Sequence, residues 1–191
     1  GNAADITVAN LEIPLTNQGV PHPTKGIVFR SAPENVSGLI YAGIDVVSLA
    51  NNHILDCMET GMTQTMNILN EAGILHSGAG LNSYEAYIPA FKSVKGQTIA
   101  FLSSSDRTGQ YNNYQPFLHA GENKSGFAYM TPFYIKQQIQ SVKDFSDIVV
   151  VEMHAGSEYS LSPGSDYDYI DFPERFENLK TNPASQTGFT I

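Results

Sequence analysis

Apolar runs of strand length alternate with helical patterns along most of this chain. Four short runs of β-branched and aliphatic residues have the composition of strands, at residues 5–10, 44–50, 74–80 and 146–154. Three stretches carry helical signals instead, at residues 32–43, 60–73 and 131–145. Alternating strands and helices predict an α/β fold with a largely parallel central sheet.

Cap residues mark the ends of the predicted helices. Thr131, followed by a proline, is placed to cap the 131–145 helix, and Thr60 is placed to cap the 60–73 helix. Gly43 and Gly73 stand where the first two helices should end.

The remaining stretches are a hairpin and two irregular segments. Residues 87–105 predict two strands joined at Lys95 and Gly96. Residues 106–130 show no regular pattern. Residues 162–191 no longer alternate between strand and helix patterns. We expect residues 1–180 to form a single domain and residues 181–191 to be a loose or truncated tail.

Polar side chains cluster where three of the predicted strands end. The clusters comprise Asn10 and Glu12, then Asn51, Asn52, His53 and Asp56, and finally His154 and Glu158. Because the carboxyl ends of parallel strands share one edge of a sheet, we expect these side chains to meet around one pocket.

The residue types in these clusters suit a metal centre. Imidazole and carboxylate groups are ligands of zinc, manganese and iron, and an amide oxygen adds a neutral ligand. A metal pair could hold a phosphate oxygen and generate hydroxide, while a nearby imidazole protonates a leaving group. Singly, each residue has a structural alternative: a strand-end asparagine often caps a turn, and Asp56 could cap the next helix. The occurrence of three clusters favours a site.

The composition of the chain argues against several kinds of partner and of structure. The formal net charge of −9 argues against nucleic-acid binding, which needs basic surface. It also opposes binding of a polyanion unless metals or a local basic patch intervene. Cys57 is the single cysteine, so no internal disulfide is possible. No apolar run approaches the roughly 20 residues that span a bilayer.

Three stretches carry a resemblance to a known family. They read DITVANLEIPLT, GIDVVSLANNHILDCMETGMTQTMNILNEAGILHSGAG and DIVVVEMHAGSEY, and lie within residues 4–160. Together they resemble the bacterial capsule-synthesis CapA/PgsA family, whose members take part in poly-γ-glutamate biosynthesis. That family is similar to calcineurin-like metallophosphatases. The resemblance therefore implies a layered α/β/β/α sandwich with a two-metal centre of manganese, iron or zinc.

The resemblance also implies roles for individual residues. Glu12, Asn52 and His154 resemble metal ligands, and His53 resembles the catalytic histidine that stabilises or protonates the leaving group. Four further residues would contact the substrate or hold the metal ligands in place: Asn10, Asn51, Asp56 and Glu158.

Two motifs of the family pattern are missing from the sequence. These are an opening strand that ends in Gly-Asp and a closing Gly-x-His-x-His motif, both of which supply metal ligands. We therefore expect a fragment, incomplete at both ends, of a longer protein that is anchored at the bacterial cell surface, with this segment soluble. An exposed sheet edge left by the absent strand would allow self-association.

Two functions follow as alternatives. The first is metal-dependent hydrolysis or transfer at phosphate or acyl groups, on a small phosphorylated substrate or an anionic polymer. The second is a non-catalytic accessory subunit that works with other capsule-synthesis membrane subunits in polymer synthesis or export. A weaker third idea is a sugar- or peptide-binding module that uses the tyrosine-rich segments 111–134 and 159–169.

Overall fold

Two three-stranded sheets form the centre of the structure, a computed structural model that describes residues 4–106 and 118–155. The first sheet is parallel and contains β1 (Val8–Asn10), β2 (Val46–Ser48) and β3 (Leu75–Ser77). The second contains β5 (Ala90–Val94), β6 (Gln97–Ser105) and β8 (Ile148–His154). In it, β5 and β6 are antiparallel and β8 is parallel to β6.

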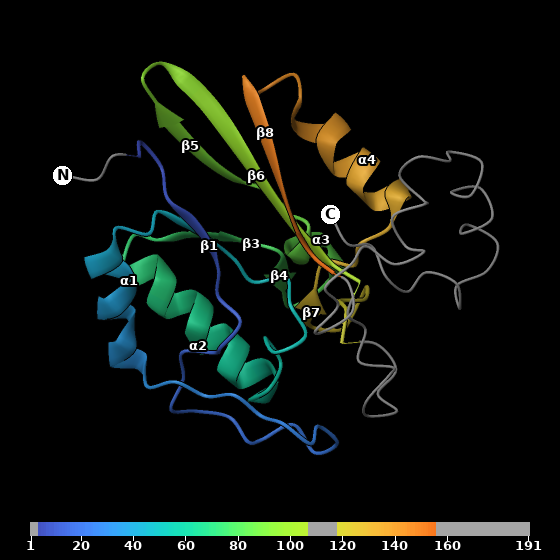
Figure 1. Ribbon diagram of the computed structural model, residues 1–191. Helices are drawn as coiled ribbons and strands as arrows, with labels where there is room; N and C mark the ends of the chain where they lie inside the picture. The colour runs from blue at the N-terminus through green and yellow to red at the C-terminus, as the bar shows by residue number, and fades with distance from the viewer. Residues whose placement is uncertain (1–3, 107–117, 156–191) are drawn as a thin grey trace, which may run out of the picture.

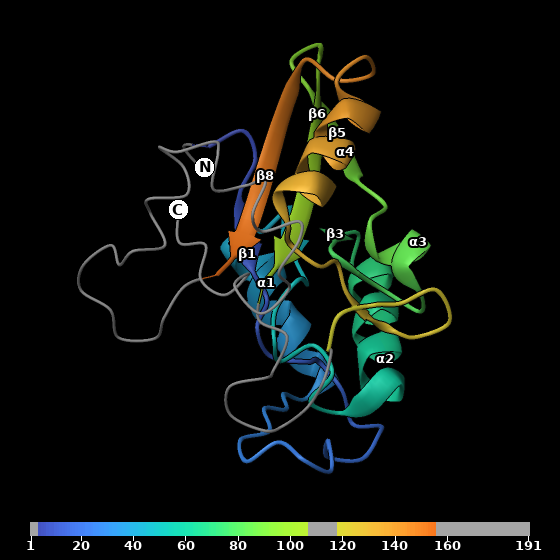
Figure 2. The same cartoon turned by 90° about the vertical axis from the view of Figure 1, so that its right-hand side faces the viewer.

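Helices cover the outer faces of both sheets (Figures 1 and 2). A short 3₁₀ turn (Pro33–Asn35), α1 (Val36–Ala42) and α2 (Met58–Glu71) lie on the first sheet. The second sheet is covered by α4 (Pro132–Val142). A small ribbon of β4 (Ala79–Gly80) and β7 (Gly126–Phe127) pairs beside α3 (Ser83–Ala86).

The alternation of side chains along β2 explains the layering. Val47 faces outward and packs in one cluster with Met62 and Leu69 of α2. Its neighbour Val46 faces the second sheet and packs against Phe101 of β6. Because both valines are fully buried, the first sheet is covered on both faces. Leu102 of β6 packs with Val142 of α4 on the outer face of the second sheet, so the order of layers is α/β/β/α. The predicted α/β sandwich is confirmed.

Several predicted turns and caps are also confirmed. The hairpin turns at Lys95 and Gly96, which both take positive φ angles, of 50° and 79°. The Thr131 side chain accepts a hydrogen bond of 3.1 Å from the backbone N–H of Tyr134 and so caps α4. Gly43 follows α1 in the left-handed conformation.

Four predictions about regular structure were wrong in detail. The parallel strands do not form one central sheet, because β8 pairs with β6 rather than with the first sheet. Helix α2 begins at Met58, before Thr60, and its N-cap residue Cys57 makes no side-chain cap. The 74–80 run is two strands in different sheets, because the chain turns at Gly78. Residues 118–130, predicted to be irregular, contain β7.

Other predictions lie partly or wholly beyond the described residues. The 181–191 tail and the end of the predicted domain fall outside them. Within residues 4–106 and 118–155, no helix has the length and apolar character needed to cross a membrane.

Gly78 holds the two sheets close together, and its substitution tests the packing. A Cβ at this position would lie 2.7 Å from the Cβ atoms of both Ala50 and Ser103, and φ is +93°. We expect Gly78→Ala to lower the free energy of unfolding by about 3 kcal/mol, because backbone strain adds to overpacking. Gly96→Ala is the matched control, since Gly96 also has positive φ but an open surrounding. It should cost about 1–2 kcal/mol. If urea denaturation showed the same loss of unfolding free energy for Gly78→Ala and Gly96→Ala, the close packing at Gly78 would be contradicted.

Candidate functional site

Polar residues that follow β1 and β2 meet the end of β8, although β8 belongs to the other sheet. The Nε2 atom of His154 lies 2.9 Å from Oδ1 of Asn52, a residue 102 positions away in the sequence. Oε1 of Glu12 lies 3.7 Å from Nε2 of His154 and 3.9 Å from Nε2 of His53. The structure therefore brings Glu12, Asn52, His53 and His154 together, as expected from the positions of their strands.

Asn51 ties the loop after β2 to the loop after β1. Its side chain is fully buried and donates hydrogen bonds to Oδ1 of Asn10 (3.1 Å) and to the carbonyl of Leu11 (2.9 Å). Its own Oδ1 accepts from the backbone N–H of His53 at 3.1 Å. Asn10 in turn donates to Oε2 of Glu12 at 3.2 Å. These bonds fix the Glu12 loop relative to His53.

The imidazole of His53 is held on two sides. Its Nδ1 atom is 2.7 Å from Oδ2 of Asp56, and its ring stacks on Phe29 with centroids 4.2 Å apart. With Nδ1 engaged, Nε2 is the ring nitrogen on the Glu12 side. The ring is thus oriented before any substrate arrives.

Asp56 is a fully buried carboxylate with a full set of partners. Lys25 pairs with its Oδ1 atom, and the backbone N–H of Phe29 donates to Oδ2 at 2.5 Å. Burial opposes ionisation of Asp56, but hydrogen bonds from His53, Lys25 and Phe29 outweigh it and lower the pKa of this carboxyl below its usual value. Asp56 is therefore ionised at neutral pH.

Lys25 and Phe29 were not predicted from the sequence. Lys25 also donates to the backbone carbonyl of Asn52 at 2.6 Å, so it supports both the His53 side and the Asn52 side of the site. Both residues come from the irregular segment before the 3₁₀ turn, where no periodic pattern indicates which part of the chain they contact.

Glu152 is a third residue that was not predicted from the sequence. It lies on the same face of β8 as His154, two residues earlier, and its Oε1 atom is buried without a hydrogen-bond partner among the described residues. Burial raises the pKa of Glu152 to about 7. A carboxylate inside the apolar run IVVVEMH was the signal that could have identified it.

The donor atoms fit part of the ligand set of one metal ion, but they do not supply the ligands for a pair of metal ions. Ligands about 2.1 Å from a metal lie roughly 3.0–3.4 Å apart. Nε2 of His154 lies 2.9 Å from Oδ1 of Asn52 and 3.7 Å from Oε1 of Glu12, just below and just above that range. In residues 4–106 and 118–155, no group of three or more His, Cys, Asp or Glu side chains could hold a metal ion. One ion would thus depend on the amide of Asn52 as its third protein ligand. Glu158, predicted to support the site, lies outside the described residues.

The Lys25–Asp56 pair gives a direct test of how the site is held together. Both side chains are almost fully buried, at 4% and 0% exposure, so Lys25→Met should leave an uncompensated charge. We expect a loss of about 3–5 kcal/mol in the free energy of unfolding. Lys95→Met is the control, because its pair with Asp5 is exposed and should contribute less than about 1 kcal/mol. A small, equal effect of both changes in chemical denaturation would refute the buried network.

Comparison with known proteins agrees with the resemblance. The profile of the bacterial capsule synthesis protein family, PGA_cap, matches residues 2–170. The chain is 30% identical to "PGA biosynthesis protein CapA" of Bacillus subtilis, over 84% of this chain and 41% of that protein. It is also 30% identical to a "Probable polyglutamine synthesis accessory protein" of Mycobacterium tuberculosis, over 85% of this chain and 44% of that protein.

A third relative and one solved structure complete the comparison. "Capsule biosynthesis protein CapA" of Bacillus anthracis is 28% identical, over 84% of this chain and 39% of that protein. A crystal structure of a candidate 5′-nucleotidase from Staphylococcus aureus aligns with a TM-score of 0.42 and 15% identity, over 76% of this chain and 32% of that one. The chain spans 39–44% of the length of these three curated relatives. Since the family profile matches most of the sequence, the chain belongs to the bacterial capsule synthesis protein family.

Proposed function

We propose that this chain forms part of a metal-dependent hydrolase or transferase that acts at a phosphate or acyl group during synthesis of a capsule polymer. The observation that supports this most strongly is the convergence of Glu12, Asn52 and His154 beside the oriented ring of His53. The Glu12 side chain is 42% exposed and that of His154 23% exposed, so the cluster is open to solvent and to a ligand on one side.

In this proposal, Glu12, Asn52 and His154 hold a divalent manganese, iron or zinc ion through Oε1, Oδ1 and Nε2. The bound ion would polarise a phosphoryl or acyl oxygen and lower the pKa of a bound water. Asn51 and Asn10 keep the Glu12 loop in place through the hydrogen bonds described above.

His53 acts as the proton donor. Asp56 holds Nδ1, so the proton on Nε2 is the one passed to the leaving-group oxygen, and Nε2 then takes a proton back from water. Phe29 and Lys25 are positioning residues, since they act on the orientation of His53 and Asp56 rather than on the substrate.

Charge at the site favours a role for a metal ion. The proposed substrate class is anionic, whereas Glu12 and Asp56 are carboxylates. Lys25 is already paired with Asp56. A divalent ion would offset this charge and admit an anionic group.

The accessory role is the second candidate. It is favoured by the small donor set, which supplies too few ligands for two ions within the described residues. It also agrees with the printed name of the Mycobacterium tuberculosis relative, an accessory protein. In that case the chain would act outside the cytoplasm, with membrane subunits, on polymer synthesis or export.

Calorimetric titration with Mn²⁺ and Zn²⁺, after treatment with a chelator, separates the two candidates. We expect Asn52→Ala and His154→Ala to weaken metal binding at least tenfold, because each removes one of three ligands. His53→Ala should retain the metal yet lower turnover of p-nitrophenyl phosphate about 10²–10⁴-fold.

His76→Ala is the matched control, because the His76 ring contacts Asn70 and none of the site residues in the contacts recorded for it, so binding and turnover should be unchanged. Absence of both metal binding and turnover in the full-length protein, with capsule formation retained in cells, would support the accessory role instead.

A further inference from the structure

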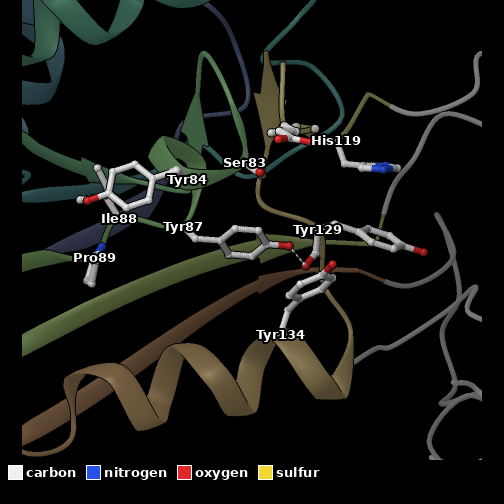
Figure 3. A pocket seen from close by; sticks show the side chains of 11 residues that line it. Ser83, Tyr84, Tyr87, Ile88, Pro89, His119, Tyr129 and Tyr134 are labelled. Atoms are coloured by element: carbon white, nitrogen blue, oxygen red, sulfur yellow. Dashed lines mark hydrogen bonds between the residues drawn. The ribbon is translucent and has the colours of Figure 1, made fainter. Parts of the chain in front are cut away.

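An aromatic cleft of about 800 Å³ lies between α3, the β4–β7 ribbon and the start of α4 (Figure 3). Its main lining residues are Ser83, Tyr84, Tyr87, Ile88, Glu122 and Tyr134. None of the lining residues belongs to the candidate metal site. The cleft is therefore a second feature that neither the metal chemistry nor the family match accounts for.

The aromatic wall of the cleft is held rigidly. The hydroxyl of Tyr87 donates a hydrogen bond of 2.8 Å to the carbonyl of Tyr129, as Figure 3 shows. The rings of Tyr87 and Tyr134 stack with centroids 5.2 Å apart and an interplanar angle of 30°. Tyr134 is fixed in turn by the Thr131 cap of α4. Such pre-ordered tyrosines lose little conformational entropy when a ligand binds.

Large side chains around the cleft remain exposed to solvent. Tyr84 is 81% exposed, Ile88 48% and Tyr134 40%. Scattered exposed aromatic residues are common, but several that line one hollow commonly mark a binding surface. The cleft thus presents ring faces and an aliphatic side chain to a ligand.

The charges of the cleft argue against an anionic ligand. Glu122 is the one acidic or basic side chain of its described lining apart from His119. Burial, with a contribution from Lys124, lowers the pKa of His119 to about 4, so this ring is neutral at physiological pH. A phosphate or a γ-glutamyl chain would be repelled by Glu122, and Lys124, the cation near His119, is not among the residues that line the cleft.

The shape of the cleft argues against a cage for a single ammonium group. Tyr87 and Tyr134 lie nearly parallel and cover part of each other, rather than forming separate walls around a small cation. The volume also matches that of pockets for ligands much larger than one ammonium group.

We propose that this cleft binds a short neutral oligosaccharide. The apolar faces of sugar rings would pack on Tyr84 and Tyr134, and the sugar hydroxyls would exchange hydrogen bonds with the tyrosine hydroxyls, Ser83 and Glu122. Binding at this cleft requires neither a metal ion nor His53, so it goes beyond the function proposed above.

The cleft also lies close to the end of β8. Tyr129, one of its lining residues, forms a β-bridge with Ser105, and the hydroxyl of Ser105 donates to the backbone carbonyl of His154 at 2.9 Å. The backbone of one lining residue is thus linked through Ser105 to the backbone of His154.

The test uses the 191-residue chain and three neutral probes, chitotetraose, cellotetraose and maltotetraose, with binding measured by calorimetry and saturation-transfer NMR. We expect at least one probe to bind with a dissociation constant in the millimolar range or tighter. Tyr84→Ala and Tyr134→Ala should each weaken it about tenfold, because each removes a stacking face. Tyr134→Phe should keep most of the affinity, since the ring remains.

Three controls make the test specific. Tyr41→Ala removes a tyrosine that is 94% exposed on α1, and it should bind as the unmodified chain does. His53→Ala should also bind normally, which separates failure of this inference from failure of the metal proposal. Circular dichroism checks that each variant is folded. If Tyr134→Ala unfolds, the separate Tyr84→Ala and Tyr134→Phe variants still test the inference.

Three results would each overturn the inference. One is that no neutral probe binds. Another is that a probe binds equally well to the Tyr84→Ala and Tyr134→Ala variants. The last is that a γ-glutamyl oligomer or a lysine-rich peptide binds at these tyrosines while the neutral sugars do not.

Discussion

The contact between Asn52 and His154 depends on the packing of two separate sheets. Asn52 follows β2 of the first sheet, and His154 ends β8 of the second, yet their side chains approach within 2.9 Å. Val46 and Phe101 fill the space between the sheets and fix the separation at which this contact forms. If β8 slipped by one residue in its register with β6, its side chains would point to the opposite face and His154 would leave the site.

The buried charge of Asp56 would destabilise the fold if its hydrogen-bond partners did not offset this cost. Asp56 is a buried charge, and an isolated charge away from water is strongly unfavourable. Lys25, the Phe29 backbone and the His53 ring together stabilise its ionised form. Glu152 shows the opposite case, since its carboxyl is buried without a described partner and its pKa rises to about 7. Stabilising a fold would not require either arrangement, which is why both point to function.

The sequence was informative wherever a pattern is local. Helical spacing, Pro132 after Thr131, and Gly96 in the hairpin each depend on neighbours a few residues away, and the structure agrees with them. The alternation of elements predicted an α/β fold, and the family resemblance implied the sandwich layers. It could not show that β8 joins a different sheet from β1 and β2, because strand pairing is decided by packing between distant segments.

The same limit applies to the candidate site. Its residues at strand ends were found because parallel strands share an edge, and the structure places them together. Lys25 and Phe29 were missed because they reach Asp56 from an irregular loop, across 31 and 27 positions. The aromatic cleft was foreseen only as a tyrosine-rich stretch, since nothing in the sequence indicates that α3 and α4 place Tyr87 against Tyr134.

The central claim is that Glu12, Asn52 and His154 bind one divalent ion between the two sheets. The most direct measurement is an anomalous difference map from crystals of the chain grown with Mn²⁺. The account predicts a peak within about 2.0–2.3 Å of Oε1 of Glu12, Oδ1 of Asn52 and Nε2 of His154. A map with no peak there at saturating Mn²⁺, or with the ion bound by other residues, would contradict it.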